Sequence, residues 1–190
     1  MITQSLQFFS VALLLGAAGF LEASELKTGS TTSLNFEDVD GKELSTADGH
    51  VTIITVVTRD NEEKARAVAD QVPDRYIGDP KYRYITLVNF QGKLPGILHA
   101  VTRGAIRGRL DAEAKELKPQ YEAKHIARDP RSDIYVIADF DGKAVTQLGL
   151  SPDSSDIEVF VFNGEGKLVR RWTDVPPDDS LAKAIASAAE

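Results

Sequence analysis

The sequence predicts an α/β domain in which a central mixed β-sheet is flanked by helices and preceded by an N-terminal β-hairpin. Two apolar runs rich in β-branched residues, 51–57 and 84–88, are separated by a segment whose apolar residues recur at helical spacing. A long helical stretch, a third apolar strand and a C-terminal hairpin follow. Strands joined through a helix are parallel, whereas a hairpin adds antiparallel strands, so the sheet should be mixed.

Composition limits the classes of function open to the chain. Its 190 residues, 42% hydrophobic and 27% charged, are enough for one domain with a buried core. The formal net charge is -7 at pH 7. An acidic chain is a poor partner for nucleic acid or for an anionic membrane, because both require a basic face. We therefore expect neither as the main partner.

Residues 1–23 are expected to be a secretory signal peptide, and residues 24–190 the mature domain. The run from Leu6 to Leu21 is apolar and is shorter than the ~20 residues that a spanning helix needs. Small residues, including Ala23 and Ser24, offer a cleavage zone after it. The protein should therefore be periplasmic or secreted, without a membrane attachment after cleavage. An uncleaved anchor is the alternative.

The first half of the mature chain predicts a hairpin followed by a strand–helix–strand unit. Asp40-Gly41 between alternating segments is a hairpin signal, and 51–57 should be a strand buried on both faces. Asp60 with Glu63 three residues later is a capping-box pattern that begins a helix ending at Pro73. The strand at 84–88 should pair in parallel with the strand at 51–57.

The second half predicts one long helix, three strands and a closing helix. The long helix should begin near Leu94, with Pro95 in its first turn, and end or kink at Pro119. The remaining elements are a strand at 133–138 followed by an Asp141-Gly142 hairpin turn, a strand at 157–162, a second hairpin turn at 163–166 leading into 167–172, and a helix at 180–188.

This order of elements resembles the thioredoxin-like superfamily, in the decorated form of peroxiredoxins and TlpA-like exported reductases. Leu34 to Lys42 is similar to the F-x-L-x-D-x-D-G-K hairpin that opens those domains, and Phe160 to Leu168 is similar to their F-x-I-D-x-x-G-x-I hairpin. The spacing of strands and turns from Tyr135 to Trp172 most resembles the YtfJ family of periplasmic proteins. The resemblance implies a thioredoxin-like fold over residues 24–190.

The chain departs from this pattern where the chemistry of those families is carried out. Their reactive cysteine lies after the first central strand, where a helix N-terminus stabilises the thiolate. The resemblance puts Asn61 at that position, Lys64 at the resolving position and Thr58 at the threonine of T-x-x-C, while Ile157 replaces the cis-proline. The chain contains no cysteine. Thiol–disulfide exchange or peroxide reduction by its own thiols is therefore excluded.

The leading hypothesis is an exported, redox-inactive module that binds a protein or peptide, or that assists another protein. The candidate site is the turn where the cysteine is missing: Thr58, Arg59, Asp60, Asn61 and Lys64. Backbone N–H groups at the helix start and the Arg59 guanidinium could hold an anion or a peptide carboxylate. The competing interpretation is an ordinary capped helix start.

Two other functions stay open. Asp139-Phe-Asp-Gly142 after an apolar strand resembles the nucleophile motif of haloacid-dehalogenase-type phosphatases, although Lys143 stands where a threonine is usual. A cysteine-independent enzyme of hydrolase type could use carboxylates such as Asp60 and Asp139. The chain could instead be an accessory component of an extracytoplasmic redox system.

The remaining polar clusters indicate no catalytic, metal or cofactor site. Arg103, Arg107 and Arg109 form either a basic patch for an acidic partner or a solvated helix face balanced by nearby carboxylates. The three histidines, His50, His99 and His125, fall in separate elements without the spacing of metal ligands. We therefore expect no metal and no cofactor.

Overall fold

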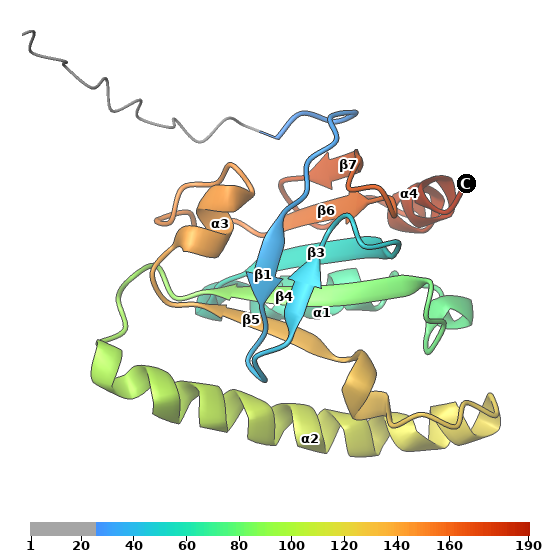
Figure 1. Cartoon of the computed structure of the whole chain (residues 1–190), viewed down its shortest axis with the longest axis horizontal. Helices are drawn as coiled ribbons and strands as arrows, with labels where there is room; N and C mark the ends of the chain where they lie inside the picture. Colours follow the sequence, from blue (N-terminus) through green and yellow to red (C-terminus); the bar gives the residue numbers. More distant parts are fainter. Residues whose placement is uncertain (1–25) are drawn as a thin grey trace, which may run out of the picture.

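The computed structural model describes residues 26–190, which form a two-stranded hairpin and a five-stranded mixed sheet (Figure 1). The hairpin pairs β1 (Asn35–Glu37) with β2 (Glu43–Ser45) through the expected Asp40-Gly41 turn. The expected signal peptide, residues 1–23, lies outside the described residues. Within residues 26–190, no helix has the length and apolar character that crossing a bilayer requires.

The five-stranded sheet has the order β5-β4-β3-β6-β7. Strands β3 (Val51–Val57), β4 (Tyr82–Asn89) and β5 (Tyr135–Asp139) are parallel, as the strand–helix–strand pattern predicts. Strands β6 (Glu158–Phe162) and β7 (Leu168–Trp172) are antiparallel to their neighbours. The helices are α1 (Glu62–Ala69), α2 (His99–Ala123), α3 (Lys143–Gln147) and α4 (Ser180–Ala188), with 3-10 turns η1 (Arg59–Asn61), η2 (Asp74–Tyr76), η3 (Gly96–Leu98) and η4 (Pro130–Asp133).

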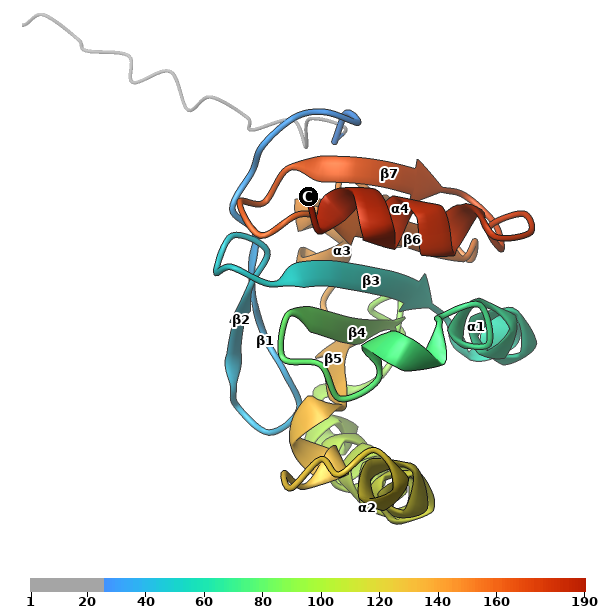
Figure 2. The ribbon, with the colours of Figure 1, turned by 90° about the vertical axis from the view of Figure 1, so that its right-hand side faces the viewer.

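The sheet lies between two layers, and side chains alternate between them along each strand. On one face, Ile54 and Val56 pack with side chains of the β1–β2 hairpin and of α3. On the other face, Ile53 and Val57 pack with α1 and α4. Figure 2 shows the hairpin on one side of the sheet, α1 on the other side and α2 beside β5. This packing explains why β3 is buried over nearly its whole length.

The prediction of a hairpin turn at Asp141-Gly142 is wrong, because helix α3 follows this turn. The turn forms, with Gly142 in the left-handed region at φ 78°, but it leads into a short helix instead of a second strand. Val145 and Leu148 are fully buried against the sheet. Burial of these two side chains, not a local helical pattern, therefore determines the structure of this segment.

The long helix was predicted to begin near Leu94 and to end or kink at Pro119, and helix α2 differs from this at both ends. The α-helix begins at His99, after η3, and continues beyond Pro119 to Ala123. Pro119 lies on the exposed side of the helix. Water can hydrate the backbone carbonyl that the missing N–H leaves without a helical partner, so the helix tolerates the proline there.

Candidate functional site

The three parallel strands end at one edge of the sheet, where the loops that follow them meet. In open α/β sheets, ligands bind in the crevice outside this carboxyl edge. Strand β3 leads into η1 and α1, β4 ends at Asn89, and β5 ends beside it at Asp139. Figure 1 shows α3 and the start of α2 at this edge. The predicted site turn belongs to the same edge.

Asn61, at the position of the missing cysteine, joins two separate segments of this edge. Its side-chain oxygen accepts the backbone N–H of Thr58 at 2.8 Å, and its amide nitrogen donates to the Ser155 carbonyl at 3.1 Å. Asn61 is buried. This contact replaces the predicted Asp60–Glu63 capping box, because the side chain that caps the turn belongs to Asn61. Both polar ends of the Asn61 amide are therefore used inside the protein.

Two more side-chain amides hold the same loop, residues 151–156. Asn89 donates to the Pro152 carbonyl at 2.9 Å, and Gln91 donates to the Asp153 carbonyl at 3.2 Å. The oxygen of Asn89 also accepts the backbone N–H of Gln91 at 2.8 Å. We call Asn61, Asn89 and Gln91 the amide clasp. It fixes the loop before β6 through neutral hydrogen bonds to backbone carbonyls.

The clasp divides the predicted site residues into buried and exposed groups. Thr58 is buried with Asn61, and its hydroxyl oxygen has no hydrogen-bond partner among residues 26–190. Arg59 and Asp60 are exposed and form no ion pair within the described part of the chain. Lys64 is exposed and pairs with Asp174 at 2.8 Å. Only Arg59, Asp60 and Lys64 are therefore open to a partner.

The helix start offers little to an anion. The Thr58 N–H is already bonded to Asn61, and α1 begins with Glu62 and Glu63. Two carboxylates in the first turn complement the positive end of the helix dipole and repel an added anion. The start of α1 is therefore poorly suited to hold a free anion.

No protein-family model matches the chain, and no curated protein matches it. Solved structures do match it across most of its length. A Chlorobium tepidum protein named as a thiol:disulfide interchange protein DsbE is 12% identical, with a TM-score of 0.51 and coverage of 86% of this chain and 99% of that chain. A peroxiredoxin-like protein from Aquifex aeolicus is 15% identical, with a TM-score of 0.50 and coverage of 87% and 89%.

The chain has a thioredoxin-like fold. This confirms the predicted fold class and the mixed sheet with an N-terminal hairpin. At identities of 12% and 15%, the likeness extends to the fold alone. Among residues 26–190 no peptide bond is cis. Ile157, which the resemblance puts at the cis-proline position, is buried with side chains of α1 and α4.

Asp139, the first residue of the D-x-D-G motif, caps a helix within the thioredoxin-like fold. Its carboxylate accepts the backbone N–H of Val145 at 2.8 Å, and the residue is buried. Burial raises the pKa of Asp139 above its ordinary value; the Val145 bond opposes this, and the neighbouring charge of Asp141 adds to it. Asp60 lies on η1, after β3, whereas Asp139 ends β5, and β4 lies between these two strands.

The three arginines of α2 have different surroundings. Arg107 donates to the Val39 carbonyl and pairs with Asp40, with 3.2 Å between Nε and Oδ1. Arg103 lies over the Phe140 ring, 5.0 Å from its centroid. Arg109 is exposed. They therefore do not form one basic patch.

The three histidines are also separate in space. His99 stacks on Phe140 with ring centroids 4.1 Å apart, and His50 contacts Asp48 at 2.8 Å, whereas His125 follows the end of α2. Across residues 26–190, no group of three or more histidine or carboxylate side chains is arranged to hold a metal ion.

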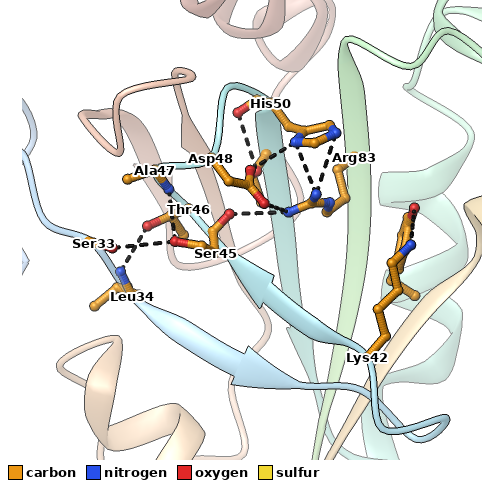
Figure 3. Close-up of polar contacts among 11 residues, drawn as sticks. Ser33, Leu34, Lys42, Ser45, Thr46, Ala47, Asp48, His50 and Arg83 are labelled. Carbon is orange, nitrogen blue, oxygen red and sulfur yellow. Dashed lines mark hydrogen bonds and ion pairs between the residues drawn. The ribbon is translucent and has the colours of Figure 1, made fainter.

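A second polar cluster, at the opposite end of the sheet, was not expected from the sequence. Arg83 on β4 is buried, and its guanidinium donates to the Ser45 carbonyl at 3.1 Å and to Asp48 at 2.8 Å (Figure 3). It also lies 2.9 Å from Nδ1 of His50. Burial raises the pKa of Asp48, but its bonds with Arg83 and His50 outweigh this and hold it below the ordinary value. We call Arg83, Asp48 and His50 the arginine clasp, which ties the end of the hairpin to β4.

Sequence reasoning missed these clasp residues for a common reason. Asn89 and Gln91 bond to a loop more than sixty residues later in the chain, and Arg83 bonds to one more than thirty residues earlier. The only local signal was a charged residue, Arg83, directly before the predicted strand 84–88 and in step with the inward positions of that strand.

Proposed function

We propose that this chain is an exported thioredoxin-fold protein that binds a protein or peptide and performs no thiol chemistry of its own. One observation carries the proposal. The position where the resemblance places the nucleophile is held by Asn61, whose amide is bonded on both sides to the protein's own backbone. An amide held in this way is neither a nucleophile nor a free ligand group. The carboxyl edge of the sheet therefore has the backbone arrangement of the fold but no group for thiol chemistry.

The surface beside Asn61 supports binding by side chains. Arg59 and Asp60 are adjacent, exposed and of opposite charge, and neither is paired within residues 26–190. Lys64 lies one turn further along, and more than half of its side chain is exposed. A partner that presents both charges near one extended segment would satisfy all three side chains. The partner we propose is therefore a protein or peptide.

The alternatives have less support from the geometry. Asp139 is occupied as a helix cap and is separated from Asp60, which weakens a composite carboxylate site. An accessory role in an extracytoplasmic redox system is a special case of the binding proposal, in which the partner carries the thiols. The narrower likeness to the YtfJ family stays a prediction, as does export.

The binding proposal is tested by capture of partners from the protein's own extracytoplasmic extract. The site variant is Arg59→Ala with Asp60→Ala, which removes two exposed side chains and leaves Asn61 in place. The matched control is Arg66→Ala with Asp70→Ala, at the end of α1, which also removes an exposed arginine and aspartate. A partner bound by the unmutated protein and the control, but lost from the site variant, is the expected result. Equal capture by all three would contradict this placement.

Export is tested separately by sequencing the N-terminus of the protein recovered from the cell. We expect a mature chain that begins at Ser24 and is found outside the cytoplasm. A cytoplasmic protein that retains Met1 would contradict the export part of the proposal.

A further inference from the structure

Helix α2 has a second apolar face, which points away from the sheet. Its inner face buries Leu110, Ala114 and Tyr121. Seven outward positions, spaced three or four residues apart, form a continuous seam along the other side. All seven are exposed, and six of them are apolar or glycine: Val101, Ala105, Gly108, Ala112, Glu116, Pro119 and Ala123.

Large apolar side chains are exposed at the beginning of this seam. Ile97 is 87% exposed, Leu98 is 42% exposed and Val101 is 69% exposed, and all three lie in η3 and the first turn of α2. Contiguous apolar surface of this kind marks an interaction site in a folded protein. The exposed seam continues from these residues along α2, so an occupant that covers all of it runs along the helix.

The glycines of α2 also point to a close neighbour outside the chain. A Cβ added at Gly104 or Gly108 would meet nothing within 4 Å. Glycine in a helix costs roughly 1 kcal/mol relative to alanine, and no contact within the chain requires it here. Glycine does allow another backbone to approach closely.

The spacing of the seam identifies the occupant as a second copy of the same helix. Val101 and Ala123 lie eleven residues on either side of Ala112 (112 − 101 = 123 − 112), Ala105 and Pro119 lie seven, and Gly108 and Glu116 lie four. An antiparallel copy centred on Ala112 therefore places each position against its counterpart. The single long polar side chain, Glu116, would lie against Gly108 of the second copy, where there is most room.

The charges beside the seam fit the same arrangement. Arg109 and Glu116 lie on one flank, and Asp111 and Lys115 on the other. Antiparallel pairing brings Arg109 near Glu116 of the second copy, and Lys115 near Asp111 of the second copy. Within the described chain Arg109, Lys115 and Glu116 have no ion-pair partner, whereas Asp111 contacts Arg131 at 3.0 Å. Opposite charges at matching positions favour this register.

We infer that the outward face of α2 docks against the same face of a second copy, as an antiparallel pair related by a two-fold axis at Ala112. Such an interface is isologous, so each contact occurs twice and the assembly closes as a dimer. The inference concerns self-association and involves none of the residues tested under the proposed function.

The absence of cysteine from the chain makes a direct test of this geometry possible. Ala112 lies on the proposed axis, so two Ala112→Cys side chains should come within the ~4.4–6.8 Å Cα separation that a disulfide allows. Two Val101→Cys side chains would lie about 33 Å apart, because 22 residues of helix separate their positions along the axis. Under mild oxidation, we expect the Ala112→Cys protein to form a covalent dimer and the Val101→Cys protein to stay a monomer.

Sedimentation of the cysteine-free protein provides the second test. The unmutated chain should be a dimer, and Arg109→Glu should raise its dimer Kd about tenfold, as for loss of a close interfacial charge pair. Arg109→Glu combined with Glu116→Arg should restore the Kd, because the exchanged charges meet again across the axis. Circular dichroism checks that each variant keeps its fold.

Three results would overturn the inference: a chain that stays monomeric at its highest soluble concentration, crosslinking of Val101→Cys as readily as Ala112→Cys, or a double variant no tighter than Arg109→Glu alone. The first would leave the seam to another partner, and the other two would exclude the antiparallel register.

Discussion

The two ends of the central sheet are each closed by a polar clasp, but the two clasps use different chemistry. At the carboxyl edge, the side-chain amides of Asn61, Asn89 and Gln91 hold the loop at 151–156. At the opposite end, the buried guanidinium of Arg83 holds the end of the hairpin through Asp48 and the Ser45 carbonyl. In both clasps, a side chain donates to the backbone carbonyl of a segment far away in the sequence.

The difference shows what each end can tolerate. The amide clasp carries no charge, so it holds the carboxyl edge of the sheet without adding a titrating group. The arginine clasp depends on a buried charge, which is stable only while its partners are present. Loss of one residue should therefore be more damaging at the arginine clasp than at the amide clasp, and only the arginine clasp should respond to pH.

The largest effect is expected from Arg83→Met. It removes the charge that pairs Asp48 and bonds the Ser45 carbonyl, so we expect a loss of about 2–3 kcal/mol in unfolding free energy, less than for a fully buried pair because Asp48 is one-third exposed. Urea unfolding measures it. Arg66→Met, at an exposed i,i+4 pair with Glu62, is the control and should change stability by less than about 0.5 kcal/mol.

A smaller loss is expected from Asn61→Ala. The change leaves the Thr58 N–H and the Ser155 carbonyl without their partner, and we expect about 2 kcal/mol of destabilisation for two lost bonds. The same urea titration measures it. If Asn61→Ala is as stable as the unmutated protein, the amide clasp does not hold this edge together.

Asn89→Ala should cost about 1 kcal/mol, since it removes one bond to the Pro152 carbonyl while Gln91 still reaches the loop. Faster hydrogen exchange should be confined to residues 151–156. Exchange that also rises in the hairpin β1–β2 would show that the two clasps are coupled, which the comparison does not predict.

The pH response should separate the two ends. The pKa of Asp48 is held below its ordinary value of 3.8, so the stability it contributes is present above that pH and is lost as the pH falls through the folded-state pKa. Arg83→Met should flatten the loss of stability in this acid range, and Asn61→Ala should leave it unchanged. Urea unfolding between neutral and acid pH measures both slopes.

The smallest effect is expected from Asp139→Asn. Burial raises the pKa of Asp139, so its charged form is disfavoured in the folded state at neutral pH, and asparagine keeps an acceptor for the Val145 N–H. We expect the variant to be equal to or slightly more stable than the unmutated protein at pH 7. A clear loss of stability would mean that the charge itself is needed at the start of α3.

The sequence predicted those elements whose pattern is local. The β-branched run 51–57, the Asp40-Gly41 turn and the closing helix at 180–188 all occur as expected, because their residues suffice to specify them. It could not predict α3, which has five residues and is determined by burial of Val145 and Leu148.

The internal geometry of the candidate site could not be predicted from the sequence. The turn at 58–61 follows β3, as the sequence indicated, yet the contact of Asn61 depends on Ser155, ninety-four residues later. Arg83 gave a signal only as a charge beside the predicted strand 84–88, and its partners could be found only once the hairpin was placed against β4.

The most direct test of the amide clasp is hydrogen exchange at the Thr58 amide, followed by NMR in the unmutated protein, Asn61→Asp and Asn61→Ala. Asn61→Asp keeps the oxygen that accepts this N–H but loses the donor to Ser155. We expect the Thr58 amide to be protected in the unmutated protein and in Asn61→Asp and to exchange rapidly in Asn61→Ala, while residues 151–156 loosen in both variants. Equal protection of Thr58 in all three proteins would contradict the claim that Asn61 closes this edge.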